Sequence, residues 1–140
     1  MALIQFENGF HGYYEVKGQK IRIGSDGLEP YDLTYGAIGA CLYSNLLRVA
    51  EERGITLPGA QVCVEGRKRA EVPTMLEYLK IRVFLGGDTS IEMQECLEEA
   101  SRKCSMLATF SKVAEIDVNL SALPFRDVSK TSCSVKKGNC

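Results

Sequence analysis

If residues 30–54 form a helix, the hydrophobic residues of its first half lie on nearly every side, and those of its second half lie on one side only. A helix that is apolar all round is typical of a buried element. Proline is well tolerated in a first helical turn, and Asp32 can cap free amides there. Gly54 can adopt the left-handed conformation that commonly ends a helix. The pattern therefore predicts one long buried helix, with Cys41 inside it.

Short segments in which polar and apolar residues alternate lie on both sides of this helix. Alternation with a period of two is typical of strands, and turns that contain glycine separate these segments. The three segments before the helix predict an antiparallel meander. The predicted strands are residues 3–6, 12–16, 20–23, 61–65, 75–85 and 113–120.

A second helix is predicted to start at Thr89, because residues 89–92 fit a capping box in which a hydroxyl and a carboxylate each satisfy a free amide. Its apolar residues are spaced four, three, four and three apart, which gives one buried stripe. The stripe places Cys104 on the inward face at the end of the helix. Residues 105–111 are predicted to be a short irregular or helical continuation.

The order of these elements predicts an α+β fold, in which an antiparallel sheet packs on two core helices. One domain is expected over residues 1–120, followed by a tail, residues 121–140, that is partly mobile. The first helix is too apolar for one sheet to cover easily. Burial between a sheet, the second helix and a partner chain would cover it.

Composition and charge narrow the range of functions. The net charge of −1 gives no electrostatic reason to expect binding to nucleic acid or to an anionic membrane. The basic run at residues 67–69 reads as a solvated loop. No apolar run approaches the length of about 20 residues that spans a bilayer, and the N-terminus does not resemble a signal peptide. We therefore expect a cytoplasmic protein.

Six cysteines in a cytoplasmic chain indicate thiols rather than a disulfide framework. No pair has Cys-x-x-Cys spacing and His11 is the single histidine, so no structural zinc site and no bound metal is expected.

Cys41 and Cys104, on the two core helices, leave two readings open. Both thiols can be small buried hydrophobic groups, which is common for free cysteine. Alternatively they form a redox pair, in which the nucleophile needs a lowered pKa. Cys41 lies too far inside its helix to gain much from the N-terminal dipole, and apolar surroundings would raise its pKa. A catalytic Cys41 would therefore need a cation, from Arg22, Arg48 or Arg82.

Two blocks of the sequence carry a resemblance to a known family. Residues 30–47, PYDLTYGAIGACLYSNLL, resemble the cysteine helix of the osmotically inducible protein C and organic hydroperoxide resistance (OsmC/Ohr) family. Residues 98–120, EEASRKCSMLATFSKVAEIDVNL, resemble the block of that family that contains the second cysteine. The segments between them are similar to the linking strands of the family. The resemblance covers roughly residues 1–120.

The resemblance implies a thiol-dependent peroxidase, active on organic or inorganic hydroperoxides. Cys41 would attack the peroxide and become a sulfenic acid, and Cys104 would resolve it to a disulfide. An external dithiol reductant would reopen the disulfide, and no bound cofactor is implied. Family members are intertwined homodimers with sites at the subunit interface, which would also cover the first helix.

The resemblance also implies an arginine from the N-terminal region on the reactive thiolate, oriented by a glutamate. Arg22 lies in that region. The glutamate position is Tyr31 here, and Asp32 is the nearest acid. Ser105 stands where the family has a proline after the second cysteine. The candidate catalytic residues are Cys41, Cys104, Arg22 and Asp32.

The other four cysteines have no role that the family supplies, and we expect incidental thiols at Cys63, Cys96, Cys133 and Cys140. A competing hypothesis keeps the dimeric fold but makes the protein a non-catalytic binding module, with a small apolar ligand in an interface pocket. That hypothesis predicts thiols with a pKa near or above the ordinary value of about 8.5. It also allows the two cysteines to lie too far apart for a disulfide.

Overall fold

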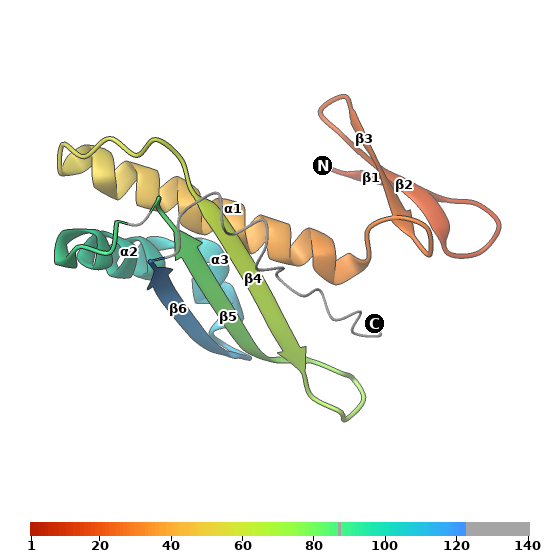
Figure 1. Cartoon of the computed structure of the whole chain (residues 1–140). Helices are drawn as coiled ribbons and strands as arrows, with labels where there is room; N and C mark the ends of the chain where they lie inside the picture. Colours follow the sequence, from red (N-terminus) through yellow and green to blue (C-terminus); the bar gives the residue numbers. More distant parts are fainter. Residues whose placement is uncertain (87, 123–140) are drawn as a thin grey trace. The chain divides into compact units, whose positions relative to one another are not determined.

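The computed structural model describes residues 1–86 and 88–122. The chain forms two compact units, of which the first ends at Thr34 and the second begins at Tyr35. Figure 1 gives the element labels used below. Most of the tail that we expected to be partly mobile, with Cys133 and Cys140, lies outside the described residues.

The N-terminal unit contains the predicted meander. Strands β1 (Leu3–Phe6), β2 (His11–Val16) and β3 (Gln19–Gly24) pair antiparallel in the order β1-β2-β3. The β2–β3 turn has two residues, Lys17 and Gly18, with φ of 49° and 74°. Positive φ at both positions gives the turn the twist that adjacent strands need. The three predicted strands are therefore confirmed.

Helix α1 (Pro30–Glu52) begins with the proline that the sequence placed in its first turn. Asp32 does not cap an amide of that turn. Its Oδ2 instead accepts a hydrogen bond of 2.8 Å from the backbone N–H of Glu29, the residue before the helix. An acid at the third helical position that reaches back in this way is one half of a capping box. Asp32 thus fixes where α1 starts.

The C-terminal end of α1 is closed by Gly54, as predicted. Gly54 has a φ of 72°, and its N–H donates to the Glu51 carbonyl at 3.0 Å. The N–H of Ile55 donates to the Ala50 carbonyl at 2.8 Å. These two bonds form a Schellman motif, which satisfies carbonyls that the helix end would leave unpaired.

The sheet of the second unit is mixed rather than wholly antiparallel. Strands β4 (Gln61–Lys68), β5 (Leu76–Phe84) and β6 (Glu115–Ser121) lie in the order β4-β5-β6. Strand β4 is antiparallel to β5, but β6 is parallel to it. The chain returns through two helices between β5 and β6, and such a crossover brings the next strand back in the same direction. The α+β class is confirmed, and the prediction of antiparallel pairing is wrong for β6.

The two helices between β5 and β6 are α2 (Ile91–Lys103) and α3 (Ser105–Phe110). Cys104 separates them with an extended backbone, φ −74° and ψ 113°. The predicted helical continuation over residues 105–111 is thus a helix of its own. Cys104 lies at a break in the backbone rather than within a helix.

The start of α2 differs from the predicted capping box. Ser90, not Thr89, is the N-cap, and its hydroxyl accepts from the N–H of Met93 at 3.3 Å. Asp88 Oδ1 accepts from the N–H of Ser90 at 3.0 Å. Asp88, an acid before the cap, therefore satisfies the N–H of the N-cap Ser90, whereas the predicted box had Glu92 satisfy the N–H of Thr89.

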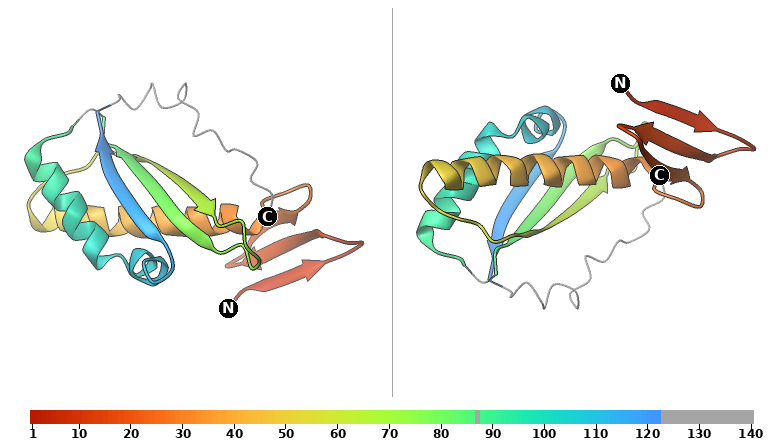
Figure 2. Two further views of the ribbon diagram at one scale, coloured as in Figure 1. Left: turned by 90° about the horizontal axis from the view of Figure 1, so that it is seen from below. Right: turned by 90° about the horizontal axis from the view of Figure 1, so that it is seen from above.

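The core of the second unit lies between the helices and the sheet. In Figure 1 the strands β4, β5 and β6 pass in front of α2 and α3, and Figure 2 shows the same elements from below and above. Fully or almost fully buried side chains include Ile38, Leu42, Leu46 and Val49 of α1, Leu79, Ile81 and Val83 of β5, and Met93, Leu97 and Ala100 of α2.

Within one chain, α1 is buried along one stripe only. Gly36, Ala37 and Ala40 are exposed, although the sequence predicted burial on nearly every side. Gly39 is buried, and a Cβ there would lie 3.4 Å from Val64. The side chains of β4 therefore pack on α1 at Gly39, and part of the apolar surface of α1 stays uncovered in the single chain.

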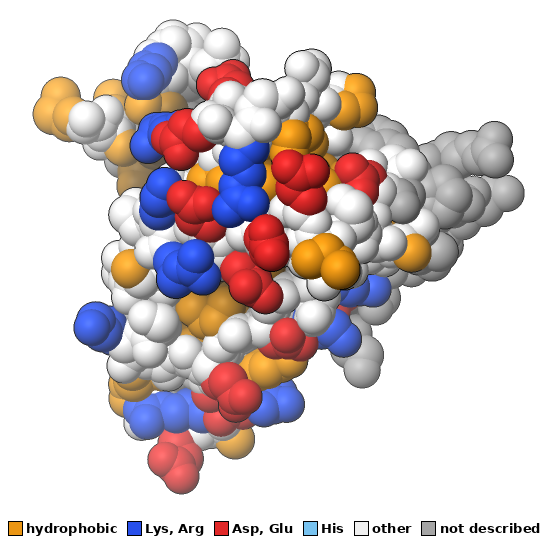
Figure 3. All heavy atoms as spheres, turned by 90° about the vertical axis from the view of Figure 1, so that its left-hand side faces the viewer, with side chains coloured by type: hydrophobic (Ala, Val, Ile, Leu, Met, Phe, Trp, Pro, Cys, Tyr) orange, Lys and Arg blue, Asp and Glu red, His pale blue; other side chains and the backbone are white. Residues whose placement is uncertain are grey.

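Acidic and basic side chains are interspersed on the face of the molecule shown in Figure 3. Just beyond α1, the guanidinium of Arg53 bonds to Glu95 at 3.3 Å and to Glu99 at 3.0 Å. Lys103 reaches the same Glu99 at 2.7 Å. The two Arg53 pairs join the end of α1 to the outer side of α2, while the Lys103–Glu99 pair lies within α2.

Candidate active site

The structure brings the two predicted cysteines together. Cys41 comes from the middle of α1, and Cys104 comes from the break between α2 and α3. Their Sγ atoms lie 3.3 Å apart, and the Cys104 thiol donates to the Cys41 sulfur. A disulfide needs a separation of about 2 Å. A small movement of either side chain would therefore join them.

Uncharged donors surround the sulfur of Cys41. The Ser105 hydroxyl lies 3.7 Å from it, and the side-chain amide of Asn45 lies 3.8 Å away. The same Asn45 amide donates to the Cys41 carbonyl at 2.9 Å, one helical turn back. Asn45 thereby fixes its own amide beside the thiol.

These surroundings lower the pKa of the Cys41 thiol. The largest contribution comes from the backbone N–H of Met106, and burial of the thiol opposes it. The Cys104 thiol and both the hydroxyl and the backbone N–H of Ser105 lower the pKa further. Hydrogen bonds to the charged form favour that form. Cys41 is thus prepared to act as a thiolate.

Cys104 has the opposite environment. Its side chain is fully buried, and this burial raises the pKa of its thiol. Cys41 is only half-buried and can be reached from solvent. One cysteine of the pair therefore favours the thiolate and is accessible, while the other stays protonated and enclosed.

The stabilisation of Cys41 described above comes from neutral groups, whereas the sequence led us to expect a cation. Arg22 lies in the N-terminal unit, where it pairs with Asp26 at 3.4 Å. Arg82 pairs with Glu65 at 2.9 Å across β4 and β5. The roles of Arg22 and Asp32 at the thiol stay predictions. Sequence reasoning missed the amides of Ser105 and Met106, because backbone donors leave no residue-type signal.

Among the described residues, the free thiols are Cys41, Cys96 and Cys104. Cys96 is fully buried, and burial raises the pKa of its thiol. Both properties are typical of an unreactive cysteine in a protein core. Cys63 is disulfide-bonded, so the expectation of an incidental thiol is wrong there.

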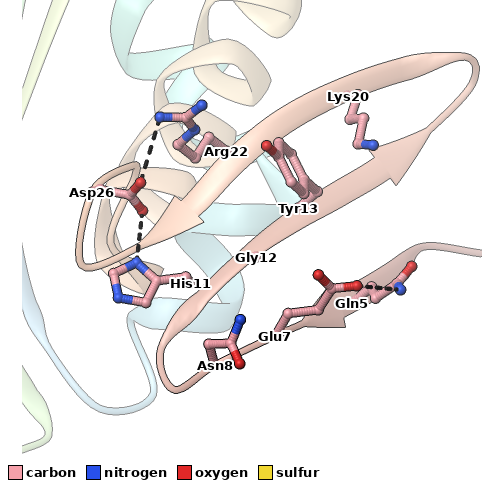
Figure 4. A pocket seen from close by; sticks show the side chains of 9 residues that line it. All are labelled: Gln5, Glu7, Asn8, His11, Gly12, Tyr13, Lys20, Arg22 and Asp26. Atoms are coloured by element: carbon pink, nitrogen blue, oxygen red, sulfur yellow. Dashed lines mark hydrogen bonds and ion pairs between the residues drawn. The ribbon is translucent and has the colours of Figure 1, made fainter.

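The surface of the described residues includes hollows in each of the two units. One, of about 560 Å³, lies in the N-terminal unit (Figure 4). Its lining includes His11 and Arg22, which both bond to Asp26. The other, of about 430 Å³, is mainly apolar and lies between α1 and β4. Small side chains line much of it: Gly36, Gly39, Ala40, Ala60, Val62 and Val64.

Within residues 1–86 and 88–122, no group of three or more histidine, cysteine, aspartate or glutamate side chains could hold a metal ion. In the same part of the chain, no helix is long and apolar enough to cross a membrane.

The model of a protein family, described as OsmC-like protein, matches residues 23–119. Solved structures with the same fold include an OsmC-like protein from Mycoplasma pneumoniae, which is 14% identical, with a TM-score of 0.77 over 86% of this chain and 94% of that chain.

Two further similar structures are of organic hydroperoxide resistance proteins. The protein from Legionella pneumophila is 16% identical, with a TM-score of 0.70 over 86% of this chain and 96% of that chain. The protein from Elizabethkingia anophelis is 17% identical, with a TM-score of 0.70 over 88% of this chain and 96% of that chain. At these identities the likeness establishes the fold. No curated protein matches the sequence.

Proposed function

The chain belongs to the OsmC-like protein family, and on that premise we propose that it is a thiol-dependent peroxidase that reduces hydroperoxides through Cys41 and Cys104. The observation that carries the proposal is the pair of sulfurs 3.3 Å apart with opposite shifts in pKa. A peroxidase of this kind needs an accessible thiolate and a second thiol within reach.

In the first step the Cys41 thiolate attacks the terminal oxygen of the hydroperoxide R–O–OH. A sulfur–oxygen bond forms, the oxygen–oxygen bond breaks, and the alkoxide leaves with the electron pair. The alkoxide takes a proton from solvent and becomes the alcohol. Cys41 is thereby oxidised by two electrons to a sulfenic acid.

In the second step Cys104 loses its proton and attacks the Cys41 sulfur. The disulfide bond forms, the sulfur–oxygen bond breaks, and the departing hydroxide takes the proton to give water. The balance of the two steps is two thiols and one hydroperoxide in, and one disulfide, one alcohol and one water out. Because Cys104 is buried beside Cys41, the sulfenic acid meets a thiol before a second peroxide.

An external dithiol would then reopen the disulfide by thiol–disulfide exchange. No bound cofactor is needed, because the two electrons come from the two thiols. The relatives from Legionella pneumophila and Elizabethkingia anophelis are named for resistance to organic hydroperoxides. We therefore propose organic hydroperoxides as the first substrates to test, with inorganic peroxide second. The proposed place of the reaction is the reducing cytoplasm.

The proposal includes a homodimer. Gly36, Ala37 and Ala40 of α1 are exposed in the single chain, although α1 is apolar on this side as well. Leu3 and Ile4 on the N-terminal sheet are 61% and 52% exposed. A second copy of the chain would cover such surfaces.

The test follows the consumption of cumene hydroperoxide with dithiothreitol as the dithiol. The wild type should turn over, and Cys41→Ser should be inactive. Cys104→Ser, without dithiol, should consume a single equivalent and accumulate a sulfenic acid that dimedone traps. Cys96→Ala, a change at the third free thiol, should stay active. Consumption by Cys41→Ser at the wild-type rate would overturn the proposal.

One observation favours a second candidate, a non-catalytic binding module. The apolar hollow of about 430 Å³ between α1 and β4 has the size of a small-ligand site. In that case the wild type would show no turnover, and the pKa of Cys41 would lie near or above the ordinary thiol value. The Cys41 environment, which lowers the pKa, favours the peroxidase.

A further inference from the structure

We propose that Ser105 is a further catalytic residue, which donates hydrogen bonds to the Cys41 sulfur from both its hydroxyl and its backbone N–H. These two donors would supply part of the stabilisation of the Cys41 thiolate that the sequence analysis expected from a cation. The consequence for peroxide reduction rests on the function proposed above, but the effect on the thiol does not.

The placement of Ser105 follows from the break at Cys104. Because Cys104 is extended, the helical hydrogen-bond ladder of α2 stops at this point and α3 begins afresh at Ser105. The first amides of a helix have no partner within it. The N–H groups of Ser105 and Met106 are such amides, and both lower the pKa of Cys41 by bonding to its sulfur.

The hydroxyl of Ser105 adds a side-chain donor to these amides. Its Oγ lies 3.7 Å from the Cys41 sulfur, within hydrogen-bond distance for a sulfur acceptor. The carbonyl of Ser105 accepts from the Thr109 hydroxyl at 2.9 Å, which ties the residue to the next turn of α3. Ser105 is thus held in place by α3 while both of its donors face Cys41.

The groups that bond to the sulfur come from α1, from the break at Cys104 and from α3. Asn45 comes from α1, Cys104 from the break between the helices, and Ser105 and Met106 from α3. All four act as neutral donors. Among the three groups that use a side chain, Ser105 alone also contributes its backbone N–H. Ser105 is therefore the residue at which two donors can be removed one after the other.

Three substitutions separate these two donors. Ser105→Ala removes the hydroxyl and keeps the N–H. Ser105→Pro removes both, and proline is compatible with the first position of a helix, so α3 can still form. Ser105→Thr keeps both donors. Ser111→Ala removes a hydroxyl at the other end of α3, where it bonds the Ala108 carbonyl, and serves as the matched control.

The measurement is the pKa of Cys41 in the fully reduced protein, from the pH dependence of its alkylation by iodoacetamide. Mass spectrometry of the peptide that contains Cys41 separates its signal from those of the other cysteines. The pKa should rise in Ser105→Ala and rise further in Ser105→Pro. At a pH below the wild-type pKa, loss of one donor should slow alkylation roughly three- to tenfold. Ser105→Thr and Ser111→Ala should match the wild type.

Unchanged alkylation profiles in both Ser105→Ala and Ser105→Pro would overturn the proposal, even if the wild type is an active peroxidase. Should Ser105→Pro fail to fold by circular dichroism, Ser105→Ala alone decides. If the profiles shift as expected but no variant or wild type consumes hydroperoxide, Ser105 stabilises the thiolate as proposed and the peroxidase function fails instead.

Discussion

At the scale of single residues, Cys41 and Cys104 are the same side chain in two environments. Cys41 stays accessible, and hydrogen bonds to its sulfur lower the pKa of its thiol. Cys104 is fully buried, and this burial raises the pKa of its thiol. In the proposed peroxidase, this contrast is the reason for giving the attack on the peroxide to Cys41 and the closing of the disulfide to Cys104.

The first prediction is the pH dependence of the peroxide reaction. The reactive form of Cys41 is the thiolate, and its pKa is lowered in the folded protein. The rate should therefore rise with pH and level off once Cys41 is ionised, with a midpoint below that of the same thiol in the unfolded chain. Stopped-flow measurement of peroxide loss in a single turnover without reductant, from pH 5 to 9, would give this midpoint.

The control for the pH profile is the unfolded chain in guanidinium chloride, in which all cysteines should titrate near the ordinary value. A folded-state midpoint at or above that of the unfolded chain would contradict the assignment of Cys41 as the activated nucleophile. It would support the binding-module alternative.

The sequence located both cysteines but not the groups that act on them. A cation seemed necessary because Cys41 lies well inside α1 and gains little from the N-terminus of its own helix. The amides that serve it belong to another helix, whose N-terminus is brought to Cys41 by tertiary packing. Backbone donors are present at every non-proline residue. The side-chain donors, which include the Ser105 hydroxyl and the Asn45 amide, do have a residue type, but nothing in the sequence pattern brings them to Cys41.

At the scale of elements, the helices and strands were largely predictable from periodicity, but their ends and pairing were not. The spacing of apolar residues placed Cys104 on the buried stripe of a helix, and burial is confirmed. The same spacing continued through the break at Cys104, because α3 keeps Leu107 buried on that side. Likewise, alternation identified β6 but carried no information on whether it pairs parallel or antiparallel.

The second prediction concerns the start of α2. Ser90 accepts from the N–H of Met93, whereas Thr89 offers only its backbone carbonyl, to the side chain of Gln94. Ser90→Ala should therefore destabilise the protein by about 1 kcal/mol, the usual cost of losing an N-cap. Thr89→Ala should cost clearly less. Urea unfolding followed by circular dichroism would measure both.

The two substitutions are matched controls for each other, since each removes one hydroxyl at neighbouring positions. If Thr89→Ala lowers the free energy of unfolding as much as Ser90→Ala or more, Thr89 is the N-cap in solution, as the capping box predicted from the sequence requires. Because Ser90 and Thr89 lie at the opposite end of α2 from Cys104, weakening the start of α2 should leave the pKa of Cys41 unchanged in both variants.

At the scale of the whole molecule, each compact unit has apolar surface that a single chain does not cover. In the second unit this surface is the side of α1 that carries Gly36, Ala37 and Ala40. In the first unit it includes Leu3 and Ile4 of β1. A three-stranded sheet is near the smallest that is stable on its own, so burial of its exposed apolar side chains against another surface would stabilise it. The proposed homodimer would satisfy both units.

The last prediction is that the protein is a homodimer, with a mass twice the 15.4 kDa of the chain in sedimentation equilibrium. Ile4→Glu and Ala40→Glu each place a charge on one of the two apolar surfaces, where burial against a partner would be costly. Both should weaken the dimer. Lys112→Glu changes an exposed residue just after α3 and should not.

A wild type that sediments as a monomer at micromolar concentration would contradict the homodimer. A dimer that neither Ile4→Glu nor Ala40→Glu weakens would show that other surfaces join the two copies. If both variants become monomers and also lose peroxide consumption, while Lys112→Glu keeps it, the second copy contributes to the site. In that case a residue of the N-terminal unit, for which Arg22 is the candidate, can act on the Cys41 of the partner.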